Sequence, residues 1–116
     1  MVVTRKLEAG DINIQIECQP ELIPVTGHAM ASGDPEVDKA AENDILSQLA
    51  DGNDWAWGAV TVSGTFHGLS ASDHLGCCSY KDEQDFRKDG YFDDMVSEVV
   101  ADLNRQVSEL VQAVLR

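Results

Sequence analysis

The chain has 116 residues and carries 21 acidic side chains against eight lysines and arginines, which gives a formal net charge of −13 at neutral pH. Charge of this sign repels nucleic acid and anionic membranes and favours partners with basic surfaces, although acidity also keeps a small domain soluble. The length suits a single compact domain over residues 1–116, and the hydrophobic content of 43% favours a folded chain.

Residues 11–18 alternate isoleucine or cysteine with polar side chains, which predicts a strand. Prolines and glycines predict a loop over residues 19–33, with room for an edge strand near residues 22–29 because Pro24 would not fit a central one. Asp34 and Pro35 then predict the start of a helix, and Gly52 predicts its end. This helix carries an apolar stripe of Val37, Ala41, Ile45 and Leu49.

Residues 55–80 predict a β-hairpin in which His67 and Gly68 form a two-residue turn. In that register Val62 faces Asp73 across the hairpin. A bulge, for which Gly58 and Gly64 are the candidate hosts, would move part of each strand to the other face of the sheet.

A short helix or helical turn is predicted over residues 82–88, and a break follows at residues 89–90. Residues 91–116 predict the longest helix, because their apolar side chains recur every three or four positions. The order is β-α-β-β-α. It predicts an α+β fold with an antiparallel sheet of three to four strands and two main helices packed on one face.

The acidic residues gather in two segments, residues 34–54 and 82–109, on either side of a nearly uncharged stretch. In the last helix Asp94, Glu98 and Asp102 recur every fourth residue, so their carboxylates rise in steps of about 6 Å. Such an unpaired row is slightly destabilising. It is compatible with a solvated face and with a row of charges that enters a groove built for nucleic acid.

The candidate partner-binding residues therefore belong to the two acidic helices and to the aromatic pair at the start of the hairpin. Trp55 or Trp57 would serve as an apolar anchor, and we expect one tryptophan in the core and the other at the surface. The full set is Asp94, Glu98, Asp102, Glu36, Asp38, Glu42, Trp55 and Trp57.

The sequence predicts no catalytic residue, no cofactor and no metal. His67, His74, Cys77 and Cys78 lie within twelve residues, but no second ligand pair of standard zinc spacing follows them. Adjacent cysteines on a strand point to opposite faces, and three cysteines form no disulfide framework. With no apolar leader or membrane-spanning run, we expect a reduced cytoplasmic protein that binds neither nucleic acid directly nor membrane.

The runs WAWGAVTV (55–62), LGCCSYKDEQDF (75–86) and GYFDDM (90–95) resemble small phage and prophage proteins to which no chemistry is assigned. The resemblance extends from about Ile23 to Leu103. It implies a non-enzymatic phage protein in the cytoplasm of a bacterial host.

Small acidic phage proteins include anti-CRISPR inhibitors, which are similar to this chain in size and charge. We therefore expect an anti-CRISPR protein that binds a basic nucleic-acid-binding surface of a CRISPR effector through its acidic helix faces and blocks target DNA. The alternative is a non-catalytic phage or prophage structural protein that assembles with itself. A homodimer is possible under either of these two functions.

Overall fold

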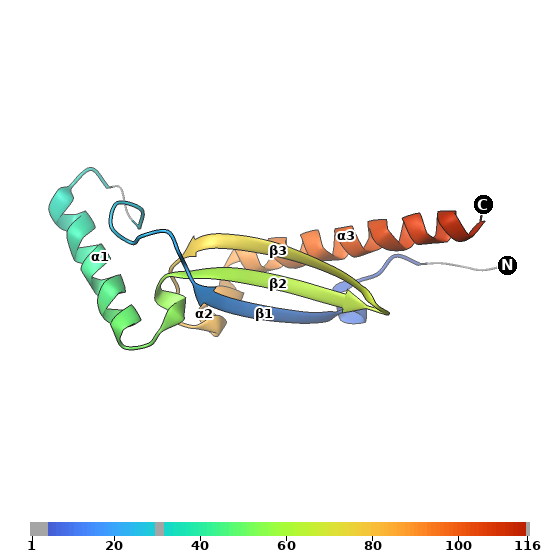
Figure 1. The fold of residues 1–116 in the computed structure, drawn as a ribbon, viewed down its shortest axis with the longest axis horizontal. Coiled ribbons are helices and arrows are strands. Elements are labelled where there is room, and N and C mark those ends of the chain that lie inside the picture. Colours follow the sequence, from blue (N-terminus) through green and yellow to red (C-terminus); the bar gives the residue numbers. More distant parts are fainter. Residues whose placement is uncertain (1–4, 30–31, 116) are drawn as a thin grey trace.

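The computed structural model describes residues 5–29 and 32–115, which form one three-stranded sheet and three helices (Figure 1). The strands are β1 (Asn13–Pro20), β2 (Gly58–Phe66) and β3 (Leu69–Cys78), and the helices are α1 (Pro35–Ala50), α2 (Glu83–Lys88) and α3 (Gly90–Leu115). Two short 3-10 turns, η1 (Ala9–Asp11) and η2 (Asp54–Ala56), precede β1 and β2. All strand pairs are antiparallel in the order β1-β2-β3, which confirms the α+β class.

The main core lies between the sheet and α3. Figure 1 shows α3 running behind the sheet, with no helix of the described residues in front of it. Val60 and Val62 of the central strand and Val99 and Leu103 of α3 are fully buried between these layers. The predicted periodicity of the last helix is therefore the pattern that makes it lie on one face of the sheet.

The structure corrects the expected placement of α1. This helix packs against η2 and the loop around Val25, beyond the end of the sheet, and not beside α3 on the sheet face (Figure 1). Its apolar stripe is too narrow to cover a sheet, because only Ile45 is buried while Val37 and Leu46 stay 48% and 44% exposed. The loop at 21–29 contains turns, so no fourth strand forms in this described segment.

The hairpin has the predicted register, with Val62 opposite Asp73 and a turn at residues 67–68. His67 and Gly68 both have positive φ, +47° and +83°, as a two-residue hairpin turn of this kind requires. The bulge, however, is on β3. Gly58 pairs with Cys78 and Val60 with Leu75, so the extra residue falls at 76–77, where Cys77 has a φ of +55°.

The short helix α2 is held by one aromatic side chain. Phe86 is fully buried, and its ring lies 5.7 Å from that of Trp55 and 5.1 Å from that of Tyr80. The Tyr80 hydroxyl in turn donates a hydrogen bond to Asp89, at 2.6 Å, just before α3 begins. These contacts set the direction in which α3 leaves the hairpin.

Beyond the sheet, α3 continues with its apolar stripe uncovered. Leu110 is 54% exposed, and Val114 and Leu115 are 75% and 79% exposed. The described part of the chain measures 66 × 26 × 22 Å because α1 and the end of α3 project from opposite ends of the sheet (Figure 1).

We expect Gly58→Ala to lower the free energy of unfolding by about 1–3 kcal/mol, measured by urea denaturation. A Cβ atom at this position would overlap the Cys18 sulfur and lie 2.9 Å from the backbone oxygen of Asp54, which cannot move aside as a side chain can. Gly90→Ala is the matched control, because a Cβ there meets no atom within 4 Å. Equal stability of the two variants would contradict this packing.

Candidate functional site

Two carboxylates of α3 are exposed to solvent on a part of the helix that is held by the core. Asp94 and Glu98 are exposed, one helical turn apart, and make no hydrogen bond or ion pair within residues 5–29 and 32–115. Their neighbours Met95 and Val99 are buried against the sheet, so this part of α3 cannot shift without disturbing the core. The spacing of the two charges is therefore set by the helix.

The third member of the predicted row is different. Asp102 is half-buried and forms an ion pair with Arg105, and its other oxygen accepts from Gln106 Nε2 at 3.3 Å. Arg105 also bonds Glu109 at 3.0 Å, and these two carboxylates raise its pKa. The row of three thus has two free charges followed by a locally neutralised group.

Beside this row runs a shallow groove between α3 and β3. It has a volume of about 380 Å³ and is lined by Ser72, Asp73, Glu98, Ala101, Asp102 and Arg105. A basic side chain entering from solvent would meet three carboxylates and one guanidinium there.

On α1 the predicted residues mostly hold the preceding loop. Asp38 accepts hydrogen bonds from the Ser32 hydroxyl at 2.7 Å and from the Ser32 N–H at 3.0 Å, and these bonds lower its pKa. Glu42 accepts from the Gly27 N–H at 3.2 Å. Glu36 alone of the three is exposed, and its side chain makes no hydrogen bond or ion pair with the described residues.

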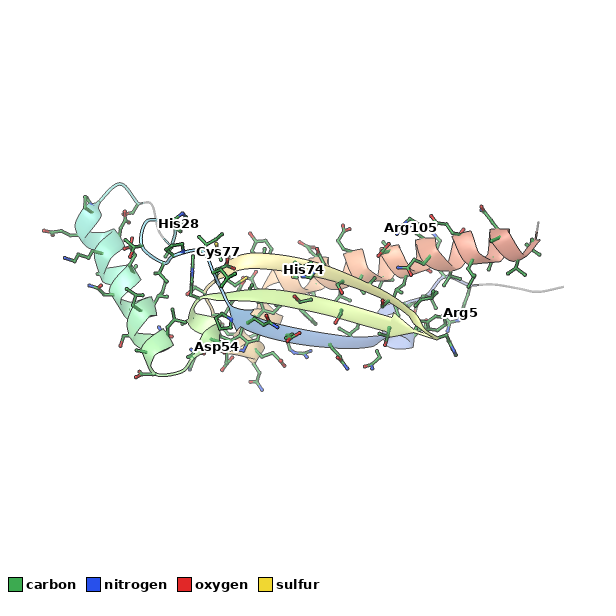
Figure 2. The ribbon with its side chains drawn as sticks, viewed as in Figure 1. Arg5, His28, Asp54, His74, Cys77 and Arg105 are labelled. Carbon is green, nitrogen blue, oxygen red and sulfur yellow. The ribbon has the colours of Figure 1, made fainter. Side chains whose placement is uncertain are left out.

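The two acidic helices do not form one continuous surface. Figure 1 places α1 at one end of the molecule and α3 behind the sheet. Figure 2 shows Arg5 and Arg105 on the part of the molecule that lies away from α1. Residues 34–54 carry seven acidic side chains against Lys39 alone, so the negative charge is most concentrated at the α1 end.

Neither tryptophan is an exposed anchor. Trp57 is only 4% exposed and donates from Nε1 to the Ile23 carbonyl at 2.7 Å, in the small core beneath α1. Trp55 is half-buried against Phe86. The expectation of one tryptophan in the core is confirmed by Trp57, whereas Trp55 is half-buried and not fully at the surface. The bulge in β3 and the η2 turn fold this pair inward, and neither feature is visible in the periodicity of residues 55–62.

The three cysteines lie near one end of the sheet, where Cys18 and Cys77 both act on the pKa of Cys78. His74 Nδ1 is hydrogen-bonded to the Thr61 hydroxyl at 3.0 Å, and Cys77 is exposed at the bulge. Burial raises the pKa of Cys18 and of Cys78 to about 11, so both thiols are protonated at neutral pH. Among the described residues no three histidine, cysteine or acidic side chains converge on one metal-sized site.

Glu21 is a positioning residue that the sequence does not reveal. Its carboxylate accepts from the N–H of Cys77 and from the N–H of Ile23, both at 3.2 Å, and so ties the loop after β1 to the bulge of β3. The contact spans 56 positions, and no local pattern marks it.

No protein-family model matches this chain, and neither the curated proteins nor the solved structures contain a match to it. In the described ranges no helix combines the length and the apolar composition needed to cross a bilayer.

We expect the Ser32 amide signal to titrate with a midpoint below the ordinary aspartate pKa of about 4, measured by NMR between neutral and acidic pH. The lowered pKa of Asp38 means that its bonds to Ser32 stabilise the loop above that ordinary value and are lost as the pH falls through the lower, folded value. Asp38→Asn is the control and should abolish the titration. A midpoint at or above the ordinary value would show that the two bonds do not form in solution.

Proposed function

We propose that this chain is a non-catalytic inhibitor that binds a basic, nucleic-acid-binding surface of another protein through α3. The observation that carries the proposal is the pair Asp94 and Glu98, two exposed carboxylates without partners in the described structure. The other side of the helix buries Met95, Val99 and Leu103 against the sheet. Since like charges one turn apart are not favourable for the helix itself, their arrangement serves a partner better than it serves the fold.

Electrostatics favours a basic groove as the partner. The net charge of −13 accelerates encounter with a cationic surface, and such association weakens as salt rises. The groove beside Glu98, with Asp73 and Asp102 on its walls, offers a place for a lysine or arginine that would otherwise contact a phosphate.

The target that we propose is the nucleic-acid groove of a CRISPR effector, where the chain would exclude target DNA. The support for this target is the resemblance of the sequence to phage proteins together with its size and acidity. The contact surface differs from the sequence-based expectation, because Asp94 and Glu98 carry it while Asp38, Glu42 and Trp57 have structural roles.

We expect the double variant Asp94→Asn, Glu98→Gln to weaken binding to a CRISPR effector by about tenfold at low salt, because two steering charges are removed from the contact. The dissociation constant is measured by biolayer interferometry at several salt concentrations. A second measurement is the degree to which each variant inhibits binding of target DNA by the effector.

The matched control removes the same two charges elsewhere. Asp44→Asn with Asp51→Asn on and just after α1 gives an equal change in net charge without touching α3. If both double variants weaken binding equally, net charge alone explains the affinity and the α3 surface is wrong. If no effector tested binds the wild-type chain, the CRISPR target is wrong.

The second candidate is a self-assembling structural protein, favoured by the uncovered apolar residues at the end of α3. Leu110 and Val114 continue the stripe that the sheet buries further back, and both are more than half exposed. We expect Leu110→Asp to reduce the mass in solution if this end assembles, as measured by light scattering. An unchanged mass, with the helix content retained, would exclude this surface.

A further inference from the structure

The two edges of the sheet are treated differently. The outer edge of β3 is partly capped by side chains: the Ser70 carbonyl accepts from Gln106 Nε2 of α3 at 2.8 Å, and the His74 N–H donates to the Asp73 carboxylate at 3.0 Å. Further along, the Cys77 N–H is taken up by Glu21. Capping of this kind prevents an edge strand from pairing with another chain.

The outward-facing groups of β1 follow from the register. A two-residue hairpin makes Phe66 and Leu69 a hydrogen-bonded pair, so the even residues of β2 bond β3 and its odd residues bond β1. Their partners in β1 are also odd, because Gln15 lies opposite Ser63, and the Glu21 N–H continues this pattern by donating to the Trp57 carbonyl at 3.2 Å.

The backbone groups of Ile14, Ile16 and Cys18 therefore point away from the sheet. No side chain within the described ranges bonds to them. Figure 1 shows β1 as the outer strand on its side. In this view α2 is drawn near its Pro20 end and η1 near its Asn13 end, and no helix or loop of the described residues runs beside its middle. This edge offers several unpaired donors and acceptors in a row.

Apolar surface accompanies the open edge. The helix α3 lies over β2 and β3, so Ile14 and Ile16 of β1 are only half-buried. Next to η1, on the flank of α3 that faces away from the acidic groove, a depression of about 520 Å³ is lined in part by Ala9, Val96 and Val100. A chain added to β1 would extend the core across this region.

The charges on β1 fit a second copy of the same chain. Glu17 is the only charged side chain on this strand, so two molecules of high negative charge can approach here with little local repulsion. Antiparallel pairing about a two-fold axis at Ile16 places Ile14 opposite Cys18 of the second copy. The same pairing places Glu17 opposite Gln15 of that copy, so the two glutamates lie diagonally across the axis and not directly opposite each other.

We propose that β1 is a homodimer interface in which two copies pair edge to edge, antiparallel about Ile16, and form one continuous sheet. The interface is isologous, since each copy contributes the same residues. The inference rests on neither candidate function, and it leaves Asp94 and Glu98 of α3 free for a partner.

The test is the dimer dissociation constant, measured by sedimentation equilibrium on the full chain. Gln15→Lys places a lysine opposite Glu17 of the second copy, twice per dimer, and should tighten the dimer by about three- to tenfold, whereas Gln15→Glu should weaken it by a similar factor. Asn13→Lys and Asn13→Asp are matched controls on the same strand and face, where the opposite residue is the neutral Gln19. They should shift the constant much less.

Hydrogen exchange gives a second measurement that needs no variant. On raising the concentration of the wild-type chain, the amides of Ile14, Ile16 and Cys18 should become protected, while those of Gln15 and Glu17 are protected at every concentration by their bonds to β2. A chain that is monomeric at about 1 mM overturns the proposal. The proposal is also overturned if the dimer dissociation constant is the same for both position-15 variants and Leu110→Asp abolishes the dimer. That result would place the interface at the end of α3.

Discussion

The distance between α3 and the central strand is the constraint on which the rest of the structure depends. At position 64 a Cβ atom would lie 2.7 Å from the side chains of both Ile12 and Val99, so only glycine allows the helix to come this close. With the helix so placed, Val99 and Leu103 fill the space above Val60 and Val62. The helix then covers the face of the sheet over β2 and β3, while the side chains of β1 on that face are only half-buried. The opposite side of the helix faces solvent.

The sequence predicts the parts of the fold that local patterns encode. The alternation in residues 11–18, the Asp34-Pro35 start of α1, the turn at residues 67–68 and the periodicity of the last helix all correspond to observed elements. The position of the bulge is not predicted by these patterns. Gly58 and Gly64 are needed because atoms distant in sequence lie too close to them for a Cβ atom. A glycine that accommodates a bulge and a glycine that accommodates a neighbouring layer look alike in a single sequence.

The candidate site shows the same division. Spacing along a helix correctly places Asp94 and Glu98 on one exposed line, but it cannot say which carboxylates are already occupied. Asp102 is neutralised by Arg105 three positions on, while Asp38 is used by a loop residue that precedes the helix. Likewise Trp57 is buried by Val25 and α1, which lie in separate parts of the chain. Some acidic side chains of this chain are thus held by local hydrogen bonds and others are free, and only tertiary contacts distinguish the two groups.

The elongated shape gives the molecule a direction. Because α1 projects from one end of the sheet while Arg5 and the end of α3 lie toward the other, the negative charge of residues 34–54 lies toward one end of the 66 Å axis. A cationic surface therefore attracts the α1 end most strongly at long range, and the contact proposed for Asp94 and Glu98 forms once α3 reaches that surface. A fluorophore or an affinity tag joined beyond either end of the described chain would therefore trail behind the approaching face, and so would interfere little with its first encounter.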